Sequence, residues 1–133
     1  MQYVDSSAFL KVHLDEPDSE SANAILDADP EWASGRHTFV EVRRNLARIL
    51  APTDLTEVRA AFVAEWDRMR IVELDEDLCD RAAELAEETG ARALDALHLG
   101  AAERVGNGTL PFVTFDRRLA DAARSLGWTV LGA

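Results

Sequence analysis

The sequence is poor in cysteine and lysine. Cys79 is the only cysteine among the 133 residues, and Lys11 is the only lysine. One cysteine cannot form a disulfide within the chain or supply the thiolates of a zinc cluster. No apolar stretch approaches the roughly 20 residues of a membrane-spanning helix, and the first residues lack the basic and apolar segments of a signal peptide. These absences predict a cytoplasmic protein with no membrane association.

Positive charge is also scarce. Fourteen basic residues face 25 acidic ones, which gives a net charge of −11 and argues against a simple nucleic-acid binder. Most of the acids must form a solvated surface that keeps the protein soluble. A few could instead gather in a cleft, where they repel one another unless a divalent cation neutralises them. Composition cannot separate these two possibilities, whereas position in the fold can.

Short β-like runs alternate with longer helical patterns along the whole chain. Such alternation predicts right-handed crossovers and parallel strands covered on both faces. We therefore expect one α/β domain over residues 1–133, a three-layer α/β/α architecture with a central, mostly parallel sheet of four to five strands. The predicted strands are 2–4, 32–34, 69–74, 111–114 and 128–131; the predicted helices are 6–14, 19–28, 38–50, about 52–68, 76–89, 93–105 and 116–126.

Two acids follow predicted strands directly. Asp5 comes after the first strand, and Asp116 comes after the strand 111–114. Sites in open parallel sheets lie beyond the carboxyl ends of the strands, where the strand order reverses. Each aspartate also precedes a helix, and Asp is a favoured N-cap residue. Either acid could therefore be a site residue, a cap, or both.

Asp95 lies early in the nearly all-apolar helix 93–105. At 100° per residue it falls on the flank of the apolar face, which predicts that its carboxylate is at least partly buried. A buried carboxylate needs a partner, a proton or a metal. An ion pair with Arg92 would be the simpler explanation, but the surroundings favour a site. The central apolar stripe of this helix is predicted to be Leu94, Leu97, His98, Ala101 and Val105.

Glu41 is explained as well by local structure as by function. Thr38 and Glu41 have the spacing of a capping box, in which the glutamate bonds back to the threonine N–H. Glu41 also points away from the apolar stripe of the helix 38–50. The residue pattern alone therefore favours a capping role for Glu41.

The remaining polar residues give weaker signals. His98 lies on the predicted core stripe, and we interpret it as a core histidine outside the site. Ser6, at a helix N-terminus, could orient a ligand or simply occupy the first turn. Four arginines flank two of the acids and could bind phosphate groups, although pairing with surface acids is the simpler interpretation for most of them. They are Arg43, Arg44, Arg117 and Arg118.

Four short motifs occur in order along the chain. They are Tyr3-Val-Asp5-Ser-Ser-Ala8, Thr38-x-x-Glu41-Val-Arg43-Arg44, Arg92-Ala-Leu-Asp95-Ala-Leu-His98-Leu99 and Thr114-Phe-Asp116-Arg-Arg-Leu119. Each is weak alone, but together they resemble a PIN domain, specifically the VapC type of toxin endoribonuclease from bacterial toxin–antitoxin pairs. The resemblance spans essentially the whole chain.

The resemblance implies a metal-dependent endoribonuclease. It makes Asp5, Glu41, Asp95 and Asp116 the catalytic acids, and Asp5, Asp95 and Asp116 the residues we expect to bind the metal. Carboxylates are the ligands that Mg²⁺ and Mn²⁺ prefer, so we expect Mg²⁺, with Mn²⁺ able to substitute. The implied products carry a 5′-phosphate and a 3′-hydroxyl. The implied partners are an RNA substrate, a cognate antitoxin that inhibits the enzyme, and a second copy in a homodimer.

Two other functions deserve comparison. A non-catalytic PIN-like binding module for an antitoxin or RNA would not need a buried acid at position 95. An aspartate-nucleophile phosphatase would carry a second acid two residues after Asp5, where this chain has Ser7. Both are therefore less favoured than the ribonuclease.

Overall fold

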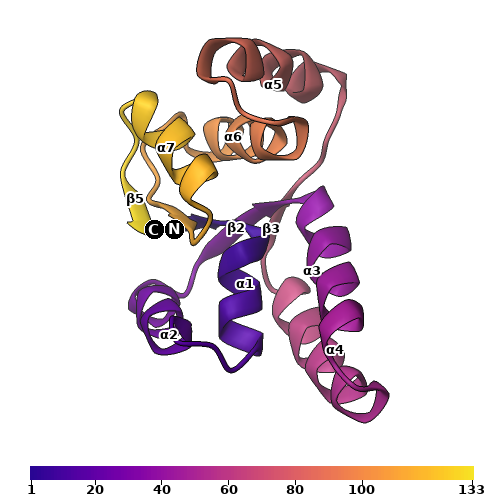
Figure 1. Ribbon diagram of the computed structural model, residues 1–133. Helices are drawn as coiled ribbons and strands as arrows, with labels where there is room; N and C mark the ends of the chain where they lie inside the picture. Colours follow the sequence, from indigo (N-terminus) through magenta and orange to yellow (C-terminus); the bar gives the residue numbers. More distant parts are fainter.

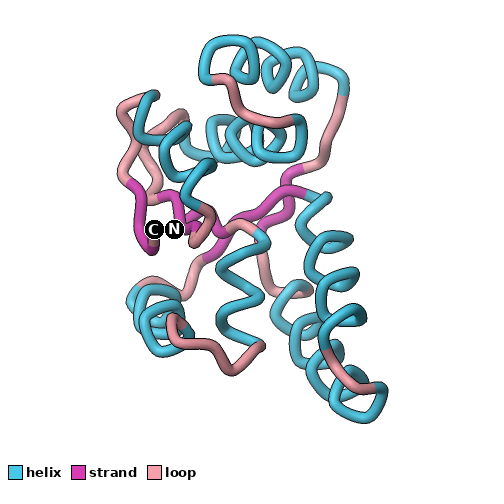
Figure 2. The backbone as a smooth tube through the Cα atoms, in the orientation of Figure 1, coloured by secondary structure: helices cyan, strands magenta, loops and turns pink.

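The computed structural model describes all 133 residues and contains five strands and seven helices (Figures 1 and 2). No helix is long and apolar enough to cross a membrane. The strands are β1 (Gln2–Val4), β2 (Trp32–Gly35), β3 (Arg70–Val72), β4 (Phe112–Thr114) and β5 (Val130–Gly132). The helices are α1 (Ser6–His13), α2 (Ser19–Ala28), α3 (Arg36–Ile49), α4 (Pro52–Trp66), α5 (Glu76–Thr89), α6 (Ala93–Gly106) and α7 (Arg117–Ser125).

All five strands are parallel and lie in the order β3-β2-β1-β4-β5. The chain moves outward from β1 to β3 on one side, then crosses back to place β4 on the other side of β1. In the registers, Tyr3 is opposite Ala33 of β2 and Phe112 of β4. The strand order therefore reverses between β1 and β4, and ligands of such sheets bind at the carboxyl ends of the strands at that point.

Helices cover both faces of the sheet, which confirms the predicted three-layer α/β/α fold. In Figure 1, α5, α6 and α7 lie on one side of the strands and α1 to α4 on the other. Successive residues of a strand point to opposite faces. Accordingly Tyr3 and Phe112 belong to the core beneath α5–α7, whereas Val4 and Val113 belong to the core beneath α1–α4.

Local signals placed most helix ends correctly. Asp75 caps α5, with its Oδ1 accepting a hydrogen bond of 2.9 Å from the Leu78 N–H. Gly90 ends the same helix with φ of +75°, a left-handed conformation that glycine adopts without a steric penalty. Arg117–Ser125 is helical as expected, with Asp116 outside the helix as its N-cap.

The predicted start of one helix and part of the predicted buried face of another were wrong. Helix α3 begins at Arg36, two residues earlier than expected, so Thr38 lies within its first turn and cannot be the cap of a capping box. In α6, Leu94 is 53% exposed although it was placed in the apolar stripe. The buried face of α6 is instead turned toward Leu99 and Ala102, because the helix packs against both α5 and the sheet.

This difference in burial within α6 is testable. Leu99→Ala should lower the free energy of unfolding by about 2–5 kcal/mol, since it leaves a cavity at a fully buried position. Leu94→Ala on the same helix should change it by less than about 0.5 kcal/mol. Urea unfolding followed by circular dichroism measures both. Equal losses for the two variants would contradict the assigned buried face.

Candidate functional site

The four predicted acids lie together in one open cleft. Its volume is about 470 Å³, and it lies beyond the carboxyl ends of β1 and β4, where the strand order reverses. The acids come from four different elements: Asp5 follows β1, Glu41 is on α3, Asp95 is on α6 and Asp116 follows β4. The cleft is lined by Asp5, Ser6, Ser7, Glu41, Arg92, Ala93, Leu94, Asp95, His98 and Asp116.

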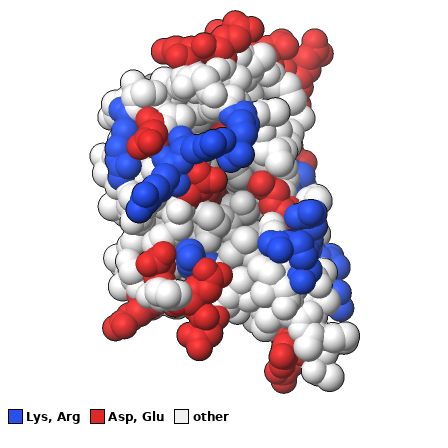
Figure 3. Space-filling model, viewed as in Figure 1, with Lys and Arg blue, Asp and Glu red and all other residues white.

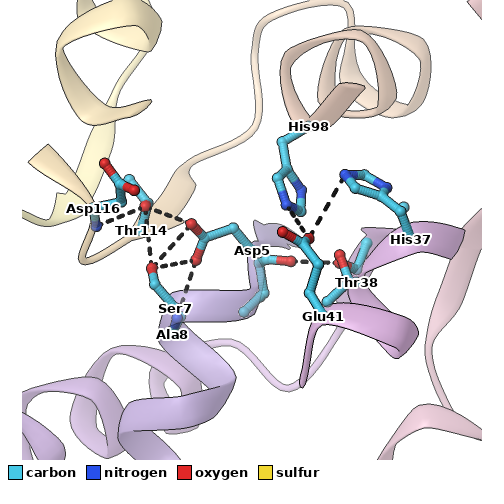
Figure 4. Close-up of polar contacts among 12 residues, drawn as sticks. Asp5, Ser7, Ala8, His37, Thr38, Glu41, His98, Thr114 and Asp116 are labelled. Atoms are coloured by element: carbon cyan, nitrogen blue, oxygen red, sulfur yellow. Dashed lines mark hydrogen bonds and ion pairs between the residues drawn. The ribbon is translucent and has the colours of Figure 1, made fainter. Parts of the chain in front are cut away.

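Asp5 is a buried carboxylate with neutral hydrogen-bond partners (Figure 4). Its Oδ1 accepts from the Ala8 N–H at 3.0 Å and so caps α1. The Ser7 hydroxyl lies 2.7 and 2.9 Å from its two oxygens, and the Thr114 hydroxyl donates to Oδ2 at 2.6 Å. Burial raises the pKa of Asp5 above its usual value, although His98 and these donors oppose the rise. The side chain is thus both a cap and a cleft residue.

Glu41 is held by a histidine rather than by a helix cap. Its Oε1 accepts a hydrogen bond of 2.9 Å from His98 Nε2, which replaces the predicted bond to the Thr38 N–H. Burial alone would raise the pKa of Glu41, but the hydrogen bond from His98, with smaller electrostatic contributions from the two histidines, leaves the pKa lowered. Glu41 is therefore ionised at neutral pH and directed into the cleft.

His98 connects the site to the core. Its side chain is 2% exposed, and its Nδ1 lies 2.8 Å from the Tyr3 hydroxyl. That hydroxyl oxygen accepts from the Gly35 N–H at 3.1 Å, which ties the ring to β2. The structure confirms the predicted core histidine, and the same side chain also lines the cleft and contacts Glu41. It is a positioning residue for Glu41, and the pairing spans 57 residues of chain.

Asp95 and Asp116 lie beside the same arginine, Arg92. Arg92 Nε lies 3.6 Å from Asp95 Oδ2, and Arg92 Nη2 lies 3.9 Å from Asp116 Oδ2. The Asp95 side chain is 14% exposed, as expected for an acid on this helix. Burial and the nearby Asp116 charge raise its pKa, while Arg92 opposes the rise. Asp116 also caps α7 by accepting from the Arg118 and Leu119 N–H groups.

Two hydroxyl groups that the sequence reasoning missed organise the site. Thr114 donates to Asp5, and its oxygen accepts from the Asp116 N–H at 3.0 Å. Ser7 contacts the same carboxylate and accepts from the Phe115 N–H at 2.8 Å. Together they link the ends of β1 and β4. The position of Thr114, at the end of a strand and two residues before Asp116, was the one available sequence signal.

His37 is buried beside the site without a partner. Its side chain is 9% exposed, and neither ring nitrogen makes a hydrogen bond of good geometry, although the Leu94 backbone lies near the ring. Burial, together with the neighbouring His98, lowers its pKa to about 4, so the ring is neutral at physiological pH. A buried polar group without a partner costs about 1–3 kcal/mol of stability. No residue pattern around His37 indicates this arrangement.

Basic side chains surround the acidic cleft. On the face shown in Figure 3, lysine and arginine side chains gather on either side of the central acids, whereas many other acids lie toward the two ends of the molecule. A neighbouring hollow shares Arg92 and Asp95 with the cleft and adds Arg118. The net negative charge is therefore not spread evenly over this face.

Comparison with known proteins agrees with this geometry. The sequence profile described as the PIN domain matches residues 2–125. Ribonuclease VapC45 of Mycobacterium tuberculosis (strain CDC 1551 / Oshkosh) is 35% identical, with 98% of this chain and 94% of that protein covered. Ribonuclease VapC46 of the same species (strain H37Rv) is 33% identical, covering 97% of this chain and 95% of its own.

Solved structures share the fold at lower identity. FitAcB from Neisseria gonorrhoeae superposes with a TM-score of 0.78 at 20% identity and covers 99% of this chain and 97% of its own. VapC20 from Mycobacterium tuberculosis, described as a sarcin-ricin loop cleaving toxin, has a TM-score of 0.72 at 17% identity, covering 92% and 95%. The chain belongs to the PIN domain family, among the VapC ribonucleases.

The repulsion between Asp95 and Asp116 predicts a pH-dependent effect on stability. Because the pKa of Asp95 is raised in the folded protein, its ionised form destabilises the fold above that pKa, and the penalty disappears as the pH falls toward the unfolded value of about 3.9. In EDTA at neutral pH, Asp95→Asn should melt at least as high as the unmodified protein, with a gain of about 1–4 °C. The gain should shrink toward pH 4. Thermal melts at several pH values measure it; a lower melting temperature at neutral pH would mean that the Arg92 ion pair outweighs the repulsion.

Proposed function

We propose that this protein is a divalent-metal-dependent endoribonuclease toxin that hydrolyses RNA phosphodiester bonds and is inhibited by a cognate antitoxin. The observation that carries the proposal is the convergence of four acids from four separate elements on one cleft, in a chain that belongs to the VapC ribonucleases. The catalytic acids of the proposal are Asp5, Glu41, Asp95 and Asp116. The proposal treats residues 1–133 as one catalytic domain that acts in the cytoplasm.

The donor set suits a hard divalent cation. Asp5 is buried among neutral donors, and Asp95 is repelled by Asp116, so a cation among these three acids would relieve both costs. Asp5, Asp95 and Asp116 are the proposed ligands of Mg²⁺, with Mn²⁺ able to substitute. Mg²⁺ keeps several of its waters, so these carboxylates need not form a closed cage. When bound, the ion lowers the pKa of a water and neutralises charge on the phosphate.

The protein's own side chains position the reacting groups. Hydrolysis adds the oxygen of a water to the phosphorus and a proton to the departing 3′ oxygen, which leaves a 5′-phosphate and a 3′-hydroxyl. Glu41 is ionised and fixed by His98, so it can orient the attacking water through hydrogen bonding. Arg92, whose side chain is 62% exposed, can turn from the acids to a substrate phosphate.

The proposed partners fit features around the cleft. The exposed large apolar side chains are Val40, Ile49 and Leu94, and Leu94 lines the cleft itself. An antitoxin segment could cover Leu94 and place an arginine among the acids, because a guanidinium occupies the space of a cation. Val40 and Ile49 on α3 are candidates for a homodimer contact.

Co-expression with a small adjacent gene tests the proposed antitoxin. The product of that gene should restore the growth of cells that express this protein, and the two proteins should co-purify.

Removing one acid should abolish cleavage without unfolding the protein. Asp95→Asn should reduce Mg²⁺-dependent RNA cleavage by about 10²–10³-fold or more, as loss of one group acting on the transition state does in other hydrolases. Asp80→Asn, an exposed position on α5, is the matched control and should retain activity. A fluorescent RNA assay with purified protein, with and without EDTA, measures both.

Two outcomes would overturn the proposal. EDTA-resistant RNA cleavage by the Asp95→Asn protein would refute the proposed metal site. Antitoxin or RNA binding without any cleavage by the unmodified protein would instead indicate a PIN-like binding module. Mapping the 5′ ends of RNA after induction distinguishes a sequence-specific ribonuclease from a contaminating one.

A further inference from the structure

The tightest set of candidate metal ligands in the protein is not made of the four acids. It consists of His37, Glu41 and His98, whose donor atoms all lie within 4.8 Å of one another. His98 Nε2 is 2.9 Å and His37 Nε2 is 3.9 Å from the same Glu41 oxygen, Oε1. The two imidazole rings lie 4.1 Å apart between centroids. Figure 4 shows both rings directed at this carboxylate.

We propose that His37, Glu41 and His98 form a binding site for a divalent transition-metal ion, with Zn²⁺ as its representative, beside the acidic cleft. Two imidazole nitrogens and one carboxylate, with a fourth position left to water, are a ligand set typical of zinc sites. Mg²⁺ prefers oxygen ligands, so this set selects a different class of ion from the one proposed for the acids.

The unpartnered His37 is the observation that points to a ligand. The ring is buried and neither of its nitrogens makes a hydrogen bond of good geometry, yet Nε2 faces Glu41. A structural histidine at such a position normally donates to a carbonyl or carboxylate. A bound cation would supply the missing partner. Glu41 and His98 line the open cleft, so an ion can reach the site from solvent.

The required movements are small. With Zn–N and Zn–O distances of about 2.0–2.2 Å, ligand atoms around a tetrahedral ion lie roughly 3.3–3.6 Å apart. His98 Nε2 and Glu41 Oε1 would separate by about half an ångström, and His37 would approach by a similar amount. The proton on His98 Nε2 would be exchanged for one on Nδ1, which can donate to the Tyr3 hydroxyl oxygen. That oxygen also accepts from the Gly35 N–H, so the Tyr3 hydroxyl already fixes the orientation of the His98 ring.

One consequence concerns catalysis and rests on the proposed function. Glu41 would be shared between this site and the acidic cleft. Zn²⁺ bound by the two histidines would coordinate the Glu41 carboxylate, which would then no longer act together with the other three acids. Micromolar zinc should then inhibit Mg²⁺-dependent RNA cleavage without competing directly for Asp5, Asp95 or Asp116.

The binding test uses purified, tag-free full-length protein and needs no activity. Zn²⁺ affinity is measured by competition with a chromogenic chelator, and Co²⁺ serves as the spectroscopic probe. The unmodified protein should bind Zn²⁺ and give the intense visible bands of tetrahedral Co²⁺ with nitrogen ligands. His37→Gln should weaken Zn²⁺ binding about tenfold or more and lose these bands.

The matched control is His13→Gln. His13, the last residue of α1, pairs with Glu65 and does not line the cleft, so its replacement should leave affinity and spectrum unchanged. Equal Zn²⁺ affinity in His37→Gln and the unmodified protein would overturn the proposal, as would a weak Co²⁺ spectrum of all-oxygen type. If His37→Gln does not fold, histidine-ring NMR of the unmodified protein decides: Zn²⁺ must shift two ring systems and spare His13.

A separate measurement distinguishes the two proposals. The cleavage rate in Mg²⁺ with added Zn²⁺ is divided by the rate of the same protein in Mg²⁺ alone. This ratio should be below one for the unmodified protein and near one for His37→Gln. No cleavage by either protein would refute the proposed function while leaving the binding result standing. Binding with no change in the rate ratio would overturn only the inhibitory consequence.

Discussion

The site depends on the hydrogen bonds of one buried carboxylate, that of Asp5. It ends β1, caps α1 and accepts from Thr114 at the end of β4, so one side chain joins three elements where the strand order reverses. Its burial is costly for a charge, and His98 together with neutral hydrogen-bond donors offsets part of that cost. The fold therefore places a costly buried carboxylate at the base of the cleft, where a cation would stabilise its ionised form.

The two halves of the site are stabilised differently. Asp95 and Asp116 repel each other and are balanced by the exposed Arg92, whose place the proposed metal or a phosphate could take. Glu41 is instead fixed by His98, and through Tyr3 by the core of the sheet. One half can thus adapt to ligands, whereas the other is already oriented. This division suits a site that must hold an ion and also align a water.

The acidity of the chain is compatible with action on RNA once position is considered. Phosphate binding needs local positive potential rather than a positive net charge. Arginines lie beside the cleft, while many of the acids face solvent at the ends of the molecule (Figure 3). The cleft itself must be negative if it is to hold a divalent ion. The same distribution would attract a positively charged segment of the proposed antitoxin to the cleft.

The sequence by itself determined the order of strands and helices, the caps at Asp5, Asp75 and Asp116, and the partial burial of Asp95. These features depend on hydrophobic period and on contacts within a few residues, which a sequence displays directly. The resemblance to a family, not the residue pattern, supplied Glu41, because a capping box explained that residue equally well. Even so, the start of α3 and the buried face of α6 were misplaced.

Only the tertiary structure decided how the site is held together. The contacts of His98 with Glu41 and Tyr3, and of Thr114 with Asp5, join residues separated by 57 to 109 positions. No local period encodes such pairings, since they arise from the crossover that places β4 next to β1. The same packing buries His37 without a partner beside Glu41. The sequence named the acids, and the packing of distant elements determined which neighbours orient them.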